Sequence, residues 1–457
     1  MKPKTTADGA EGPDAAGPSA TATRAFVVHP HLKSDRDSRR TPESALAECV
    51  ALAAALDLEV VGAEVAPLAK AHAGALFGSG KIAAIKAQVE ATEVELVIVD
   101  AAVTPIQQRN LEKAWGAKVL DRTGLILEIF GERASTREGV LQVDLAHLSY
   151  QKSRLVRSWT HLERQRGGVG FMGGPGETQI EADRRALDEK IARLRRQLEK
   201  VVQTRGQHRK ARAKTPVPVV ALVGYTNAGK STLFNRLTTA DVLAKDMLFA
   251  TLDPTMRAIR LPSGRRVILS DTVGFISELP TQLVAAFRAT LEEVLEADVI
   301  VHVRDVSHPE TEAQKADVLD VLADLGVGEA RLEAMVEARN KIDLVDPEER
   351  GPLLAETARA GAVALSAATG EGVDALMAAV EARLAEARLP ALVRVPQADG
   401  RAAAWLHARG VVTGRRDGET FADLDLAISE RELAQFAKAF PDAAILDRAE
   451  GLARAAQ

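Results

Sequence analysis

A glycine-rich octapeptide in the middle of the chain combines the residue types that bind phosphate groups. This octapeptide, Gly224-Tyr-Thr-Asn-Ala-Gly-Lys-Ser231, fits the pattern G-x-x-x-x-G-K-[ST]. The apolar run at 219–223 predicts a buried strand before it, and residues 231–237 have helical spacing after it. Glycines let successive backbone amides curl around an anion, and the helix N-terminus adds unpaired donors. The segment therefore predicts a nucleoside triphosphate site, against the alternative of a glycine turn that fits the pattern by chance.

Two side chains at the end of this loop could act directly on the phosphates. The Lys230 ammonium could reach the β and γ phosphates, and the Ser231 hydroxyl could ligate Mg²⁺. The residues predicted to surround the phosphates are Gly224, Tyr225, Thr226, Asn227, Ala228, Gly229, Lys230, Ser231 and Thr232.

Two later segments have the residue types of a γ-phosphate sensor. Asp271 follows a predicted strand, so its carboxylate could hold Mg²⁺ through water while the Gly274 amide contacts the γ phosphate. The Thr251 hydroxyl could complete the Mg²⁺ shell only while the γ phosphate is present, which predicts a switch segment. Lys230, Thr251 and Gly274 are therefore the predicted catalytic residues. The two segments comprise Phe249, Ala250, Thr251, Leu252 and Asp253, and Asp271, Thr272, Val273 and Gly274.

The choice of base follows from two motifs that come after later strands. A carboxylate at Asp343 could accept hydrogen bonds from both N1–H and the 2-amine of guanine, whereas adenine offers no such pair of donors. The alkyl stem of Lys341 could lie along the base, and the Ala367 amide could donate to guanine O6. The predicted base-binding residues are Asn340, Lys341, Ile342, Asp343, Ser366, Ala367 and Ala368. Each motif is weak alone, but their order after successive strands predicts GTP.

The residue after Gly274 is Phe275, at a position where Ras-like GTPases have the glutamine that orients the attacking water. Phenylalanine cannot hydrogen-bond water. One interpretation is that the site lacks a catalytic group at this position. The other is that Phe275 is an apolar switch residue that packs in the protein while another group contacts the water. Both interpretations predict slow hydrolysis by the isolated chain and a partner that completes the site.

Composition indicates a globular protein of a reducing cytoplasm. The 457 residues suffice for about three domains. No apolar stretch approaches the roughly 20 residues needed to span a bilayer, and the N-terminus lacks the apolar core of a secretory signal. Cys49 is the only cysteine and lies in an Ala/Leu run, which favours a buried, unreactive thiol. The net charge of −5 argues against a uniformly basic surface, although it permits a local basic face.

Alternating strand and helix patterns predict an α/β multidomain protein. The predicted parts are a disordered tail (1–23), an N-terminal α/β domain (24–138), an antiparallel helical hairpin (139–215), a Ras-like P-loop GTPase domain (216–388) and a small C-terminal α+β domain (389–457). In the last of these, Ser429 and Glu432 have the spacing of a capping box at the start of the final helix.

The predicted hairpin has features of an RNA-binding element. Its glycine-rich tip, 167–176, lies between two amphipathic helices, the second of which ends in a basic run at 205–214. Basic side chains could meet phosphates, and two apolar residues at the tip could pack on bases. These side chains are Arg154, Arg157, Arg164 and Arg166, and Phe171 and Met172. The alternatives are a solvated helix face and a loop that packs on itself.

Taken together, these motifs resemble those of HflX-family GTPases. The resemblance lies in 224–231, Phe249-Ala-Thr-Leu-Asp-Pro-Thr255, Asp271-Thr-Val-Gly-Phe275 and Asn340-Lys-Ile-Asp343. More specific to the family are Asp121-Arg-Thr-Gly124, Trp159-Thr-His-Leu-Glu-Arg-Gln-Arg-Gly-Gly168 and Gly174-Pro-Gly-Glu-Thr178. The resemblance covers residues 25–385, and the chain past residue 390 matches less clearly.

This resemblance implies a GTPase that uses Mg²⁺ and binds the rRNA of the large ribosomal subunit in its GTP state. It further implies hydrolysis stimulated by ribosomes, dissociation or rescue of stalled ribosomes, and a monomeric free protein. The implied location is the cytoplasm, with the membrane periphery as an alternative.

Two other functions remain open at this point. One is a ribosome-assembly or RNA-remodelling factor that uses ATP at the N-terminal domain, where Gly78-Ser-Gly-Lys81 could bind phosphate at a helix start. A glycine turn at the helix entry is the simpler explanation of that segment. The other is a small-molecule P-loop kinase, which the predicted recognition of guanine by Asp343 disfavours. His147 and His161 have no metal-ligand companions and are predicted to be structural or RNA-facing.

Overall fold

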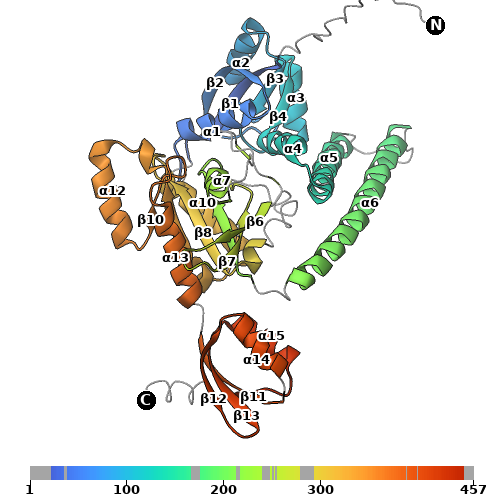
Figure 1. Ribbon diagram of the computed structural model, residues 1–457. Helices are drawn as coiled ribbons and strands as arrows, with labels where there is room; N and C mark the ends of the chain where they lie inside the picture. Colours follow the sequence, from blue (N-terminus) through green and yellow to red (C-terminus); the bar gives the residue numbers. More distant parts are fainter. Residues whose placement is uncertain are drawn as a thin grey trace, which may run out of the picture. The chain divides into compact units, whose positions relative to one another are not determined.

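The chain forms two compact units in the computed structural model. Figure 1 labels helices and strands of both. The structure describes residues 22–34, 39–165, 175–212, 217–238, 248–249, 252, 255–277, 293–386, 389–398 and 400–446. The first unit comprises Met1–Arg36 and Pro42–Leu125, and the second comprises Asp37–Thr41 and Ile126–Gln457.

The first unit contains a parallel sheet of four strands in the order β2-β1-β3-β4. The strands are β1 (Arg24–Leu32), β2 (Glu59–Leu68), β3 (Leu96–Val99) and β4 (Lys118–Asp121). The helices are α1 (Pro42–Ala54), α2 (Ser79–Ala91) and α3 (Pro105–Trp115). Alternate residues of β1, such as Phe26 and Val28, pack in one apolar cluster with α2 and α3. The α/β class predicted for this part of the chain is therefore confirmed.

Local signals explain the bounds of α3. Thr104 and Gln107 form a capping box at its start, Pro105 occupies its first position, and Gly116 ends it in the left-handed region at φ +71°. Cys49 of α1 is buried as predicted, and this burial raises the pKa of its thiol well above the ordinary value.

Three helices, α4 (Arg122–Arg133), α5 (Arg137–Gln165) and α6 (Pro175–Arg212), follow the first sheet. Helices α5 and α6 pack against each other, with an ion pair between Lys152 and Asp188, so the predicted hairpin is present. Helix α6 begins at Pro175, near the end of the predicted loop 167–176, and proline suits the first turn of a helix. The tip residues Phe171 and Met172 lie outside the described residues.

The second unit contains a six-stranded sheet in the order β10-β9-β8-β5-β7-β6. Its strands are β5 (Val219–Gly224), β6 (Thr255–Arg260), β7 (Arg266–Asp271), β8 (Val299–Asp305), β9 (Val336–Asn340) and β10 (Val363–Ala364). Only β6, which the sequence did not predict, runs antiparallel to its neighbour. The helical segments are α7 (Lys230–Thr238), α10 (Thr311–Asp324), α11 (Glu329–Glu333), η1 (Ile342–Leu344), α12 (Pro347–Arg359) and α13 (Val373–Glu386).

Side-chain alternation along β8 divides the interior of this sheet into two layers. Val299, Val301 and Val303 join an apolar cluster with α7 and α13. The residues between them include His302 and Arg304, which are buried on the face that α10 contacts. Helices therefore cover both faces, and the carboxyl ends of the parallel strands form one edge, where ligands bind in folds of this type.

The C-terminal part forms an antiparallel sheet in the order β12-β13-β11-β14. Its elements are β11 (Leu389–Pro396), α14 (Gly400–Ala408), β12 (Val412–Asp417), β13 (Phe421–Ile428), α15 (Glu430–Ala439) and β14 (Ala444–Leu446). This β-α-β-β-α-β succession is ferredoxin-like and confirms the predicted α+β class. The predicted capping box of α15 is also confirmed, since the Glu432 amide donates to Ser429 Oγ at 3.3 Å.

Within the described parts of the chain, none of the helices has both the length and the apolar character needed to cross a membrane.

Candidate nucleotide-binding site

The loop between β5 and α7 has a backbone that only glycine permits at two positions. Gly224 has φ +154°, and a Cβ there would lie 2.2 Å from the Val303 carbonyl oxygen of β8. Gly229 has φ +92°, and a Cβ there would lie 2.2 Å from Asn340 Nδ2. The close approach of β8 and of the Asn340 side chain therefore dictates both glycines of the motif.

Lys230 lies inside this loop as a buried cation. Its Nζ donates to the carbonyl oxygens of Gly224, at 3.1 Å, and Tyr225, at 2.8 Å. Burial lowers the pKa of the ammonium to about 8, although the charge of Asp271 opposes this shift. An ammonium held by two carbonyls in a concave loop fits the phosphates of a nucleotide.

The side chains of Ser231 and Asp271, both with oxygen atoms, lie together beside the loop. Ser231 Oγ donates to Asp271 Oδ2 at 2.8 Å, and Asp271 is fully buried at the end of β7. A hydroxyl and a carboxylate are hard ligands that suit Mg²⁺, which usually takes its other ligands from water and substrate phosphates.

Backbone hydrogen bonds at Phe275, the residue directly after the predicted γ-phosphate sensor Asp271–Gly274, join this segment to the phosphate loop. The Phe275 amide donates to the Gly224 carbonyl at 3.1 Å, and the Thr226 amide donates to the Phe275 carbonyl at 2.7 Å. A Cβ at Gly274 would lie 3.2 Å from Lys230 Nζ and 2.8 Å from Thr226 Cα. Gly274 therefore lies next to the ammonium. The Phe275 side chain is 3 % exposed and packs inside the protein.

Thr272 and Val273 are buried between these groups. The Thr272 hydroxyl donates to the Leu222 carbonyl at 2.6 Å, so it ties β7 to β5.

Asn340 connects the phosphate loop to both base motifs. Its Nδ2 donates to the Ala228 carbonyl and its Oδ1 accepts from the Ala367 amide, each at 2.8 Å. It is buried at the end of β9. The predicted motifs at 224–231, 340–343 and 366–368 are thus brought together around one side chain.

The remaining base-motif residues surround this connection. Asp343 is exposed in η1, whereas Ile342 is buried beneath it. Lys341 has a left-handed backbone at φ +67°, and its Nζ pairs with Asp305 Oδ2 at 2.8 Å. The exposed Asp343 carboxylate can accept hydrogen bonds from the edge of a base, and the alkyl stem of Lys341 can cover the face of that base.

Two residues that contact the base motifs were not predicted from the sequence. Asp305, the partner of Lys341, is the last residue of β8, and its position at the carboxyl end of a strand was a usable signal. Arg236 of α7 donates from Nε to the Ala367 carbonyl at 2.6 Å and from Nη2 to the Ala368 carbonyl. Arg236 belongs to no motif, so nothing in the sequence pointed to it.

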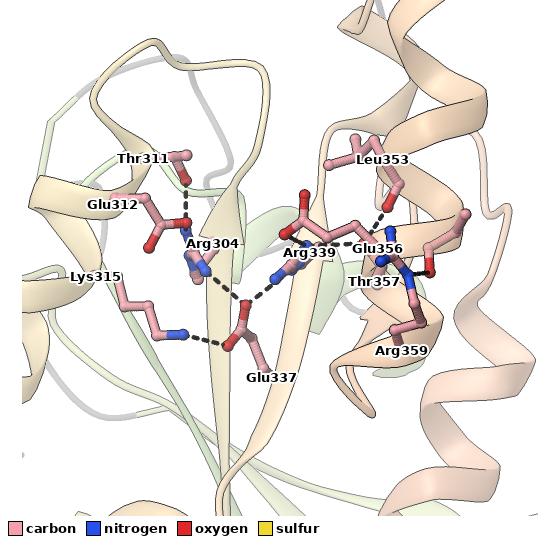
Figure 2. Close-up of polar contacts among 11 residues, drawn as sticks. Arg304, Thr311, Glu312, Lys315, Glu337, Arg339, Leu353, Glu356, Thr357 and Arg359 are labelled. Atoms are coloured by element: carbon pink, nitrogen blue, oxygen red, sulfur yellow. Dashed lines mark hydrogen bonds and ion pairs between the residues drawn. The ribbon is translucent and has the colours of Figure 1, made fainter.

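A largely buried network of ion pairs joins β8 and β9 to the helices α10 and α12 (Figure 2). Glu337 accepts from Arg304 at 2.6 Å, from Arg339 at 3.0 Å and from Lys315 at 2.7 Å. Burial alone would raise the pKa of Glu337, but the Lys315 hydrogen bond and the Arg304 charge lower it to about 2. Arg339 also reaches Thr357 of α12 at 3.2 Å. These ion pairs therefore link β8 and β9, the strands that end in Asp305 and Asn340.

The predicted switch segment is described only in part. Phe249 is buried with a left-handed backbone at φ +57°, and its ring meets that of Phe130 edge-on at 4.8 Å. Leu252 is also buried. Ala250, Thr251 and Asp253 lie outside the described residues, so the role of Thr251 stays a prediction.

Two minor sequence features have structural partners. Lys81 Nζ pairs with Glu64 Oε2 at 2.9 Å, and Gly78 caps α2 without a side-chain hydrogen bond. His147 Nε2 lies 3.1 Å from the Leu127 carbonyl oxygen, which favours the structural interpretation of this histidine. The side chain of His161 lies outside the described residues.

The fold and site define a P-loop protein with the guanine-type motif arrangement of Ras-like GTPases. Four family models match the chain: "GTP-binding GTPase N-terminal" at 43–131, "GTP-binding GTPase Middle Region" at 133–212, "50S ribosome-binding GTPase" at 219–340 and "HflX C-terminal domain" at 354–444.

Curated relatives agree with these matches. GTPase HflX of Magnetococcus marinus is 53 % identical over 85 % of this chain and 89 % of its own length. GTPase HflX of Escherichia coli is 44 % identical over 83 % and 87 %. A solved GTP-binding protein of Sulfolobus solfataricus, in complex with GDP, aligns at a TM-score of 0.41 and 22 % identity over 80 % of this chain and 99 % of that one. The chain belongs to the HflX family of GTPases.

Membership of this family corrects one expectation. The family resemblance was expected to fade past residue 390, yet the C-terminal family model extends to residue 444. The region beyond 390 is therefore part of the family pattern.

The lowered pKa of Lys230 predicts that nucleotide binding depends on pH. Phosphates bind the protonated ammonium, so the apparent Kd for GDP should be flat below pH 7.5 and rise above the pKa of about 8. The expected rise is about tenfold per pH unit, because each molecule that binds must first take up a proton. Titrations between pH 7 and 9.5 would measure it.

A matched variant isolates this group. Lys230→Arg stays protonated over this range, so it should bind more weakly but without the slope. An equal slope in both proteins would assign the pH dependence to another group.

Proposed function

We propose that the site described above holds Mg²⁺ and GTP. In this proposal the loop amides and Lys230 bind the phosphates, and Ser231 and Asp271 hold the metal, Asp271 through water. Thr251 completes the metal shell when the γ phosphate is present, and Asp343 selects guanine. The Asn340 connection supports the assignment, since it joins the phosphate loop to the base motifs at 2.8 Å on each side.

Phe275 supports slow hydrolysis by the isolated chain. Its side chain is buried and apolar, and its amide and carbonyl are both engaged by the phosphate loop. No polar group of this residue is available to orient water. The attacking water must be positioned by another group, which we assign to a complex with a partner.

The partner that we propose is the large ribosomal subunit, bound in the GTP state. The observation that carries this step is the match of 219–340 to the family model described as a 50S ribosome-binding GTPase. The hairpin α5–α6 is the element that we assign to rRNA, although the side chains of Arg157 and Arg164 lie outside those that the structure describes. In this proposal the free protein is a cytoplasmic monomer that dissociates or rescues stalled ribosomes.

Turnover with and without purified large subunits tests this function. GTP hydrolysis should rise more than about tenfold when subunits are added. The protein should cosediment with the subunits in a non-hydrolysable GTP analogue and separate from them in GDP. Equal cosedimentation in both nucleotides would refute the switch, and unchanged turnover would refute the stimulation.

ATP use at the N-terminal unit is a weaker proposal. Lys81 would have to leave Glu64 before it could bind a phosphate, and that pair is 2.9 Å long. Comparison of ATP binding by the wild-type protein and Lys81→Ala would decide it, with unchanged affinity counting against the site.

A further inference from the structure

A short segment outside every sequence motif contacts the phosphate loop. Asp37–Thr41 belongs to the second unit, although the residues on both sides of it belong to the first. Arg39 pairs with Asp317 at 3.7 Å and with Asp320 at 2.6 Å, both on α10. The Thr41 amide donates to Glu310 Oε1 at 2.9 Å, just before that helix begins. The segment is therefore held against α10 at both of its described ends.

Between these two anchors, Arg40 carries a largely buried charge, with its side chain 10 % exposed. Its guanidinium carbon lies 4.9 Å from the centre of the Tyr225 ring, and its Nη1 donates to Ser277 Oγ at 3.2 Å. Glu310 at 3.9 Å and Asp317 at 3.6 Å balance the charge. A desolvated guanidinium over an aromatic face is a favourable contact, so this arrangement holds Tyr225 and Ser277 in one cluster.

Tyr225 and Ser277 belong to the two segments that are predicted to surround the γ phosphate. Tyr225 is the second residue of the phosphate loop, and Ser277 lies three residues after Gly274. The Ser277 amide donates to the Tyr225 hydroxyl at 2.8 Å, next to the backbone bridge between Tyr225 and Phe275. That bridge keeps Gly274 beside Lys230 Nζ. Arg40 therefore contacts both members of the Tyr225–Ser277 hydrogen bond, which lies next to the bridge that positions Gly274.

We propose that Arg40 is a positioning residue for the γ phosphate and thereby sets the preference of the site for GTP over GDP. By holding Tyr225 against Ser277, it keeps the Gly274 amide where the third phosphate binds. This inference rests on the proposed assignment of Gly274. Because GDP has no γ phosphate, removal of Arg40 affects the triphosphate and leaves the diphosphate largely unaffected.

The test compares two affinities in the full-length protein. Arg40→Ala should weaken a non-hydrolysable GTP analogue about three- to thirtyfold, the range given by a desolvated cation–π contact, with GDP affinity within about twofold. Single-turnover GTP hydrolysis should slow as well. Arg40→Lys keeps the charge but not the planar donor to Ser277, so it should restore part of the loss.

Matched variants separate positioning from simple stability. Arg39→Ala removes the adjacent ion pairs but contacts neither Tyr225 nor Ser277, and should change neither affinity. Tyr225→Phe removes only the hydroxyl that accepts from Ser277, and should reproduce the selective loss. Combined with Arg40→Ala, its effect should be less than additive, because both act on one connection.

Two results would overturn the proposal: equal weakening of the GTP analogue and GDP by Arg40→Ala, which marks a merely structural role, or no change in either. A wild-type protein that binds the analogue no better than GDP in the presence of Mg²⁺ would instead refute the assignment of Gly274 on which the inference rests.

Discussion

Replacement of Asp343 by asparagine is expected to weaken GDP and GTP binding about a hundredfold or more, because guanine's N1–H and 2-amine lose a shared acceptor. The same change should favour xanthosine nucleotides. Xanthine has a carbonyl in place of the 2-amine, so the asparagine amide can donate to it while accepting from N1–H. The exposed position of Asp343, at the edge of a site held by Asn340, leaves this carboxylate open to the base. Titration with GDP and XDP would measure both effects.

A nearby aspartate provides the control. Asp346 is also exposed and lies three residues further on, where it precedes α12 without a side-chain capping bond. Asp346→Asn makes the same change in charge and should leave both affinities unaltered. If Asp343→Asn bound GDP as tightly as the wild-type protein, the assignment of the guanine selector would be wrong.

Gly229→Ala is expected to weaken nucleotide binding at least about 30-fold. The methyl group would lie 2.2 Å from Asn340 Nδ2 at a backbone φ of +92°. Asn340 cannot move aside easily, since it is bonded at both ends to Ala228 and Ala367. Overpacking and left-handed strain each cost about 1–3 kcal/mol, which together correspond to a loss of about 30-fold to 10⁴-fold. GDP titration and thermal unfolding of the variant would measure this loss.

Gly264→Ala separates the two contributions. Gly264 has φ +82° but no atom within 4 Å of an added Cβ. It lies in the turn between β6 and β7, so its replacement should lower Tm without changing GDP affinity. Should Gly229→Ala bind GDP normally at unchanged Tm, the close contact with Asn340 would not constrain the site.

Local residue types explain where several helices begin and end. The bounds of α3 and the capping box at Ser429 follow from short-range hydrogen bonds within a few residues, which the sequence displays directly. Strand β6 was not predicted, because Thr255–Arg260 is only partly buried and its apolar alternation is weak. Its pairing with β7 decides its conformation, and that partner follows only after a turn.

The residues of the candidate site also fall into those that the sequence predicted and those that it did not. The motif residues were found because each carries its chemistry in a contiguous run: glycines for the phosphates, a lysine and a serine, and the carboxylate of Asp343. Arg236 and Asp305 were not found, because their function depends on which main-chain or side-chain groups they meet across the fold. Arg40 is the extreme case, since its partner Tyr225 is far away in the sequence.

The sequence by itself determined the family, the order of the nucleotide motifs and the chemical type of each predicted contact, because these depend on residue identity and local spacing. The tertiary structure decided how the motifs are joined. The parallel order of β9, β8, β5 and β7 brings strand ends that are distant along the chain to one edge, where Asn340 meets Ala228 and Gly274 meets Lys230. Strand order arises from burial and packing of the whole sheet, which no local pattern encodes.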